Sequence, residues 1–149
     1  FACNNQETAR FINNSIVDER ALREIYLAGF EMVVKEAKPY TIMASYNKLN
    51  GKHTTENKWL LTDVLRNEWG FDGVVMTDWF STNKGLGHNA LAMRAGNDLI
   101  MPGGGAYKKE ILAGVKSGMI KEEDVKRCCA NVVRAIMNSA TQKEYIDKK

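Results

Sequence analysis

Residues 60–79 read LLTDVLRNEWGFDGVVMTDW, and this stretch decides the fold. Its first half carries four apolar residues at helical intervals, Leu60, Leu61, Val64 and Leu65. That spacing predicts an amphipathic helix over about residues 56–69, which Gly70 ends. The apolar, β-prone run over residues 73–77 predicts a strand. An uninterrupted apolar strand is typical of a parallel sheet that is buried on both faces.

The same order of elements extends toward the N-terminus. Residues 18–38 predict a helix with Asp18 as its N-cap, and residues 40–45 predict a strand. Asn50-Gly51 predicts a turn. The apolar face of the helix is expected to comprise Leu22, Ile25, Tyr26, Gly29, Phe30, Val33 and Ala37.

The order also extends toward the C-terminus. A short helix is expected over residues 88–95 and a third strand over residues 98–101. Helices are then expected over residues 107–117 and 122–139. The apolar stripe of the last helix is expected to comprise Val125, Cys128, Val132, Val133 and Ile136.

Strands that alternate with helices predict an α/β fold with a parallel sheet. A complete (β/α)8 barrel of the TIM type needs roughly 200 residues or more, and this chain has 149. We therefore expect a partial barrel, with about the last three βα units in residues 1–140 and a polar, frayed tail over residues 141–149. Its missing strands would have to come from the same or another chain, because open strand edges promote aggregation. Phe1 also reads as the end of a strand already under way, as if the chain had been cut there.

The composition excludes several classes of protein. The net charge is only +3 and the basic residues are scattered among acids, so nucleic acid is a poor partner. No stretch is apolar for long enough to span a membrane, and no signal segment is visible, which leaves the cellular compartment open. The three cysteines, Cys3, Cys128 and Cys129, lack metal-ligand spacing and are expected to be reduced.

The working residues of barrel enzymes lie at the carboxyl ends of the strands. Here the first predicted strand leads into Ser45-Tyr46-Asn47 and the second into Thr77-Asp78-Trp79. A carboxylate beside an aromatic ring suits a sugar site, but an Asp after a strand is also a common turn former. Asp98 opens the third predicted strand, so we expect it at the opposite end of the barrel.

Several long motifs occur in one consistent order: FACNNQE (1–7), NNSIVDERALREIYLAGFE (13–31), MASYNKLNG (43–51), LLTDVLRNEWGFDGVVMTDW (60–79) and AGNDLIMPG (95–103). In this order they resemble glycoside hydrolase family 3, of the β-glucosidase-like kind, and the resemblance covers nearly the whole chain up to about residue 139. It implies a retaining hydrolase that releases a terminal β-linked sugar, most often β-glucose, from an oligosaccharide or aryl β-glycoside. No metal or organic cofactor is expected.

The resemblance also implies roles for four residues. Asp78 matches the catalytic nucleophile, which forms a glycosyl-enzyme intermediate, and Tyr46 matches a residue that orients it. Met43 matches a residue that lines the pocket for the terminal sugar, and Trp79 matches an aromatic residue that shapes the neighbouring subsite. These four residues alone do not determine whether the terminal sugar is glucose or xylose.

Parts of the family pattern are missing. The Lys-His pair that precedes the position of Phe1 is absent, as are an Asp and an Arg from earlier strands. The acid/base usually comes from a separate α/β sandwich domain, which this chain lacks. A retaining mechanism needs two carboxylates, so we expect the second to come from outside this chain. The alternative is a non-catalytic barrel fragment: a proteolytic remnant, one piece of a split enzyme, or a half-barrel that associates with itself.

Overall fold

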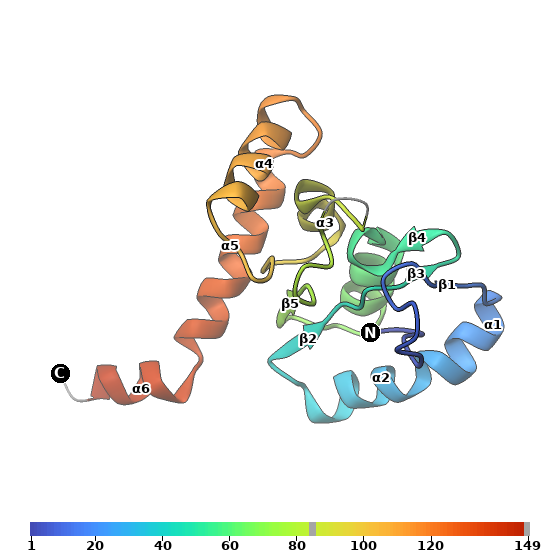
Figure 1. The fold of residues 1–149 in the computed structure, drawn as a ribbon. Helices are drawn as coiled ribbons and strands as arrows, with labels where there is room; N and C mark the ends of the chain where they lie inside the picture. Colours follow the sequence, from blue (N-terminus) through green and yellow to red (C-terminus); the bar gives the residue numbers. More distant parts are fainter. Residues whose placement is uncertain (84–85, 148–149) are drawn as a thin grey trace.

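The computed structural model describes residues 1–83 and 86–147 (Figure 1). Helices and strands are mixed along the chain, which confirms the α/β class. The strands are β1 (Asn14–Ser15), β2 (Thr41–Met43), β3 (Lys48–Leu49), β4 (Lys52–His53) and β5 (Val74–Met76). The helices are α1 (Glu19–Ala21), α2 (Ala28–Met32), α3 (Asn89–Ala95), α4 (Gly105–Lys116), α5 (Glu122–Met137) and α6 (Ala140–Asp147). Wider π-type turns form η1 (Leu22–Tyr26), η2 (Val33–Ala37) and η4 (Trp59–Glu68), and η3 (Thr54–Glu56) is a 3-10 turn.

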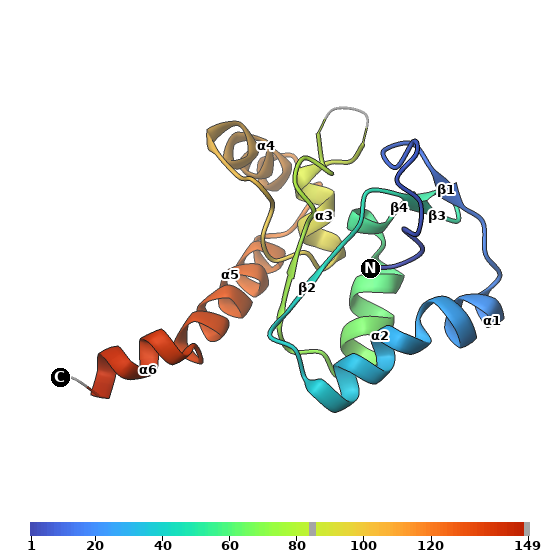
Figure 2. The same cartoon turned by 60° about the horizontal axis from the view of Figure 1, so that its bottom comes forward.

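Two parallel strands, β2 and β5, form the centre of the molecule. Ile42 of β2 pairs with Val75 of β5 in the middle of the ladder. The helical segment from α1 to η2 lies to one side of this pair and α4 and α5 lie to the other (Figure 2). Between them α3 is joined to η4, because the hydroxyl of Thr62 donates to the carbonyl of Ala95 at 2.8 Å. Phe1 lies beside the end of β2, where its nitrogen is 3.1 Å from the carbonyl oxygen of Met43.

The third predicted strand, residues 98–101, is reduced to a single parallel bridge between Leu99 and Met76. The carbonyl of Leu99 accepts the N–H of Thr77 at 3.0 Å. Farther on, the N–H of Met101 bonds to the side-chain hydroxyl of Thr77 at 2.9 Å. Because a side chain replaces the backbone carbonyl at that step, the ladder ends after one residue.

A second small sheet, in the order β1-β3-β4, was not predicted. Strands β3 and β4 form a hairpin about Asn50 and Gly51, whose φ angles of 50° and 85° are those that a tight hairpin turn requires. The predicted turn is therefore confirmed. The sheet itself escaped prediction because strands of two residues are too short to show an alternating pattern.

The apolar face predicted for the first helix is wrong in part. Leu22, Leu27 and Val34 are the buried residues, whereas Ile25 and Val33 are 69% and 50% exposed. The N–H of Leu27 bonds to the carbonyl of Leu22, five residues back, at 2.8 Å. Such a wide turn breaks the 3.6-residue period, so the residues that follow rotate away from the expected face. The predicted N-cap is confirmed, because the carboxylate of Asp18 accepts the N–H of Ala21 at 2.9 Å.

The core prediction for η4 is confirmed. Leu60, Leu61, Val64 and Leu65 are fully buried and pack in one cluster with Val75 of β5. This cluster fixes the position of β5, and with it the residues that follow the strand.

The last helices differ from the expectation. On α5, Cys128 is buried as expected, but Val133 and Ile136 are more than half exposed. The second half of α5 projects away from the two sheets in both views, which leaves that part of the stripe uncovered (Figures 1 and 2). Residues 140–147 form helix α6 where a frayed tail was expected, and residues 148–149 lie outside the described part of the chain. Within residues 1–83 and 86–147, no helix has both the length and the apolar character that crossing a bilayer requires.

Candidate active site

Asp78 lies two residues beyond the carboxyl end of β5 and is half-buried. One carboxylate oxygen, Oδ1, accepts the N–H of Trp79 at 2.7 Å. The carbonyl of Asp78 accepts both the N–H and the hydroxyl of Ser81, at 3.3 and 2.8 Å. These bonds form a tight turn that holds the carboxylate at the edge of the sheet.

Tyr46 reaches the same turn from the neighbouring strand. It follows β2 by three residues, and its side chain is buried. Its hydroxyl donates to the carbonyl of Trp79 at 2.8 Å. Burial raises the pKa of Tyr46, and a hydrogen bond to Asp78 and the negative charge of that carboxylate raise it further. The hydroxyl thus donates to the carbonyl of Trp79, and the carboxylate of Asp78 lies close enough to influence its pKa.

The other two predicted site residues lie at the same edge with exposed side chains. Trp79 is 53% exposed, and its ring meets that of Phe80 edge to face, with the ring centres 5.9 Å apart. Met43 ends β2 opposite Met76, and its side chain is about half exposed. The structure thus places Asp78, Tyr46, Trp79 and Met43 at the same end of the β2–β5 pair, with Asp78, Tyr46 and Trp79 joined by hydrogen bonds around one turn.

Sequence reasoning missed the residues that surround the ring of Tyr46. Phe11 meets that ring edge to face at 4.6 Å, and the guanidinium of Arg10 lies 4.9 Å from its centre. Arg10 also pairs with Glu7 at 2.6 Å. In the sequence, the aromatic residue Phe11 directly after Arg10 was the one available sign that this loop packs against another aromatic ring.

Asp98 lies away from this edge, as expected. Its side chain is fully buried and pairs with Arg66 at 2.5 Å. It also accepts the N–H of Val75 and the amide N–H of Asn131, both at 2.9 Å. With its oxygens occupied in this way, Asp98 acts as an internal tie between β5, η4 and α5.

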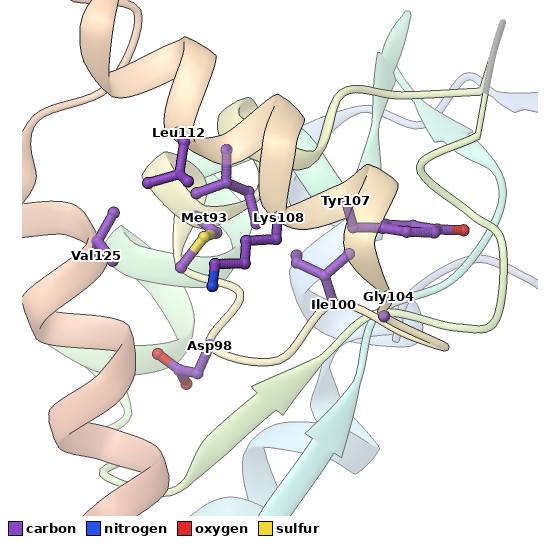
Figure 3. Close-up of a pocket in the computed structure, with 10 residues that line it drawn as sticks. Met93, Asp98, Ile100, Gly104, Tyr107, Lys108, Leu112 and Val125 are labelled. Carbon is purple, nitrogen blue, oxygen red and sulfur yellow. The ribbon is translucent and has the colours of Figure 1, made fainter.

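A cavity of about 360 Å³ opens next to Asp98, between α3, α4 and α5 (Figure 3). Apolar side chains dominate its walls, among them Met93, Ile100, Ile111 and Val125. Asp78 and Tyr46 do not line it, so this cavity is separate from the candidate site. In residues 1–83 and 86–147, no group of three His, Cys, Asp or Glu side chains is arranged to hold a metal ion.

Comparison with known proteins identifies relatives along nearly the whole chain. Residues 7–135 match the model of the glycosyl hydrolase family 3 N terminal domain. The chain is 48% identical over 138 residues to beta-glucosidase B of Emericella nidulans, which covers 91% of this chain and 16% of that protein. It is 46% identical over 135 residues to an exo-alpha-(1->6)-L-arabinopyranosidase of Bifidobacterium longum, covering 89% and 17% of the two chains.

Solved structures agree with these sequence matches. Beta-glucosidase 3B of Thermotoga neapolitana, in complex with glucose, superimposes with a TM-score of 0.89 at 45% identity, covering 97% of this chain and 21% of that one. The chain thus spans about a sixth of the length of the two curated relatives, 16% and 17%. The family model, the relatives and the shared fold all lead to one conclusion: the chain belongs to glycoside hydrolase family 3.

Proposed function

We propose that this chain supplies the nucleophile of a retaining glycoside hydrolase of the β-glucosidase type, and that Asp78 is that nucleophile. The supporting observation is the contact between the ends of two parallel strands. The buried phenol of Tyr46, which follows β2, donates there to the carbonyl of Trp79, the residue directly after Asp78. A turn that is bonded to a buried phenol can hold a half-buried carboxylate toward a sugar, whereas a simple turn former needs no such partner.

The reaction then runs in two steps. A carboxylate oxygen of Asp78 attacks the anomeric carbon while the bond to the leaving oxygen breaks, and an acid protonates that oxygen. Water next attacks the anomeric carbon of the glycosyl ester, gives its proton to the same residue, and frees the carboxylate of Asp78. We propose that Tyr46 holds the carboxylate in place during both steps. We propose that the acid/base residue comes from a region outside this chain, namely an α/β sandwich domain.

We propose a terminal β-linked sugar as the substrate, with β-glucose as the first choice. Trp79 offers an exposed ring beside Asp78 that suits the apolar face of the group next to the cleaved bond. We assign Met43 to the wall of the pocket for the terminal sugar. The arabinopyranosidase among the relatives makes L-arabinopyranosides the second substrate class to test.

We further propose that residues 1–140 form part of a (β/α)8 barrel, which other strands complete on the same or another chain. Leu99 pairs with β5 on one side only among the described strands, and its side chain is 39% exposed. The apolar cavity of Figure 3 opens nearby and lies against Ile100. A further βα unit would cover this edge and fill the cavity. A half-barrel that associates with itself would bury the same surfaces.

The proposed nucleophile is tested by mass spectrometry with a 2-deoxy-2-fluoroglucoside that carries a good leaving group. This reagent forms the glycosyl ester but slows its hydrolysis, so a retaining enzyme accumulates the adduct. We expect one added sugar on the full-length protein, mapped by peptide analysis to Asp78. Asp78→Asn should abolish the adduct and lower kcat by at least about 10⁴-fold. The matched control is Asp72→Asn, which removes an exposed carboxylate at the opposite end of β5.

An adduct on a different residue, or an active Asp78→Asn variant, would refute the assignment of Asp78. The barrel proposal is tested separately by measuring the molar mass of the isolated chain in solution. A monomer that binds the apolar dye ANS, and loses that binding when the remaining barrel segment is added, would support completion by other strands. A stable homodimer without dye binding would support the self-associating half-barrel.

A further inference from the structure

A second hollow, of about 530 Å³, lies between the start of η4, helix α3 and the first turns of α5. Neither Asp78 nor Tyr46 lines it, so it is separate from the candidate active site. A hollow of this size can hold a small organic ligand. Basic side chains from β4 and from each of these helical segments share its walls: Lys52, Lys58, Arg94, Lys121 and Arg127.

The acidic residues of the hollow do not balance these charges. Glu56 and Asp124 line it, so its walls carry a surplus of +3, which is as large as the net charge of the whole chain. Both carboxylates already have partners, because Glu56 accepts the N–H of His88 and Asp124 pairs with Arg127 at 2.8 Å. In residues 1–83 and 86–147, three of the five basic side chains form no ion pair: Lys52, Arg94 and Lys121.

The two arginines of the hollow are held in place by the backbone. Arg94 donates to the carbonyl of Met119 at 3.0 Å, and Arg127 donates to the carbonyl of Met93. A guanidinium has five N–H donors, and Arg94 uses one of them in this bond, so others stay available to an anion. A side chain that is already fixed loses little conformational entropy when a ligand binds, and the forked guanidinium matches the oxygens of phosphate.

We propose that this hollow is an anion-binding site for a small molecule that carries phosphate or sulfate groups. A concave wall lined mainly by one sign of charge concentrates the electrostatic field inside it, which favours a compact multivalent anion. The helix η4 adds to this field, because it begins directly after Lys58 and has no acidic residue in its first turn. The proposal does not rest on the role of Asp78, since it concerns a different part of the molecule.

The experiment measures the binding of inorganic pyrophosphate to the full-length protein by isothermal titration calorimetry at constant ionic strength. Arg94→Met and Lys52→Met each remove one cation but keep an apolar stem. Lys52 is exposed and forms no ion pair, so its variant tests the site even if Arg94→Met weakens the fold. The matched control is Arg20→Met, which breaks an exposed pair with Glu24 at 3.0 Å and lies outside the hollow. Asp78→Asn reports separately on any binding of the anion in the candidate active site.

We expect the wild type to bind one pyrophosphate per chain. Arg94→Met should weaken this binding about 10-fold and Lys52→Met about 3-fold, whereas Arg20→Met and Asp78→Asn should bind like the wild type. Titrations with inorganic phosphate and with sulfate then show which of the two groups the site prefers. The proposal is wrong if the wild type binds none of the three anions, or if Arg20→Met weakens binding as much as Arg94→Met. A changed affinity in Asp78→Asn alone would place the anion in the candidate active site and would equally overturn it.

Discussion

Replacing Asp98 by alanine is expected to lower the free energy of unfolding by about 3–5 kcal/mol. The Asp98 side chain has no solvent exposure, and its partner Arg66 is only 12% exposed. The same carboxylate accepts the N–H of Val75 and the amide of Asn131. The substitution therefore leaves one cation, one backbone N–H and one side-chain amide without their acceptor.

The magnitude follows from these three losses. Breaking a buried ion pair by removing one partner costs about 3–5 kcal/mol, and an unpaired buried N–H costs about 1–3 kcal/mol. The losses do not add fully, because Arg66 keeps the carbonyls of Gly73 and Gly96 as acceptors at 3.1 and 3.3 Å. We therefore expect a total near 4 kcal/mol, a large part of the roughly 5–15 kcal/mol by which a typical domain is stable.

Urea unfolding of the purified protein, followed by tryptophan fluorescence, measures this change. The control is Asp63→Ala, which breaks an exposed pair with Lys58 at 3.5 Å and should cost no more than about 1 kcal/mol. A double-mutant cycle of Asp98→Ala with Arg66→Met should give a coupling free energy well above 1 kcal/mol. If Asp98→Ala proves no more destabilising than Asp63→Ala, the buried contacts of Asp98 with Arg66, Val75 and Asn131 do not stabilise the fold as argued here.

Three further predictions concern packing, reactivity and pH. Gly114→Ala should destabilise the protein by about 1–3 kcal/mol in thermal melts, because the new β-carbon would lie 2.6 Å from the nearest side-chain carbon of α3. The control Gly29→Ala has open space around it and should be neutral or stabilising in the same assay. Iodoacetamide should label the exposed Cys129 in the native protein long before Cys128, whose pKa is raised by burial to about 12; peptide mapping that finds Cys128 labelled equally fast would contradict this. Burial lowers the pKa of His53 below its ordinary value of 6.5, so the folded state binds a proton on His53 less readily than the unfolded state. The stability of the protein should therefore fall as the pH drops below about 6.5. Between pH 8 and pH 5, the urea midpoint should fall less steeply for His53→Gln than for wild type.

Local patterns predicted the elements that depend on short-range spacing. The apolar residues of η4 and the short strand β5 followed directly from the sequence of residues 60–79. The turn at Asn50-Gly51 and the cap at Asp18 followed from the conformational preferences of those residues. The order of the motifs along the chain identified the family, because order is a property of the sequence itself.

Patterns failed where the backbone departs from regular geometry or where the surroundings decide burial. The wide turn between Leu22 and Leu27 rotates the first helix, so a period of 3.6 residues selects the wrong face. On α5, Val133 continues the apolar spacing of the helix but is exposed, because the second half of α5 projects away from the rest of the molecule (Figure 2).

The sequence by itself determined the α/β class, the family, and the position of Asp78 after a buried strand. Only the tertiary structure decided what surrounds that carboxylate. Parallel pairing of β2 with β5 brings Tyr46 to the turn at Asp78 across 31 intervening residues, and the fold then places Arg10 over the tyrosine ring. No local pattern encodes these contacts, because they depend on which strand ends become neighbours when the core closes.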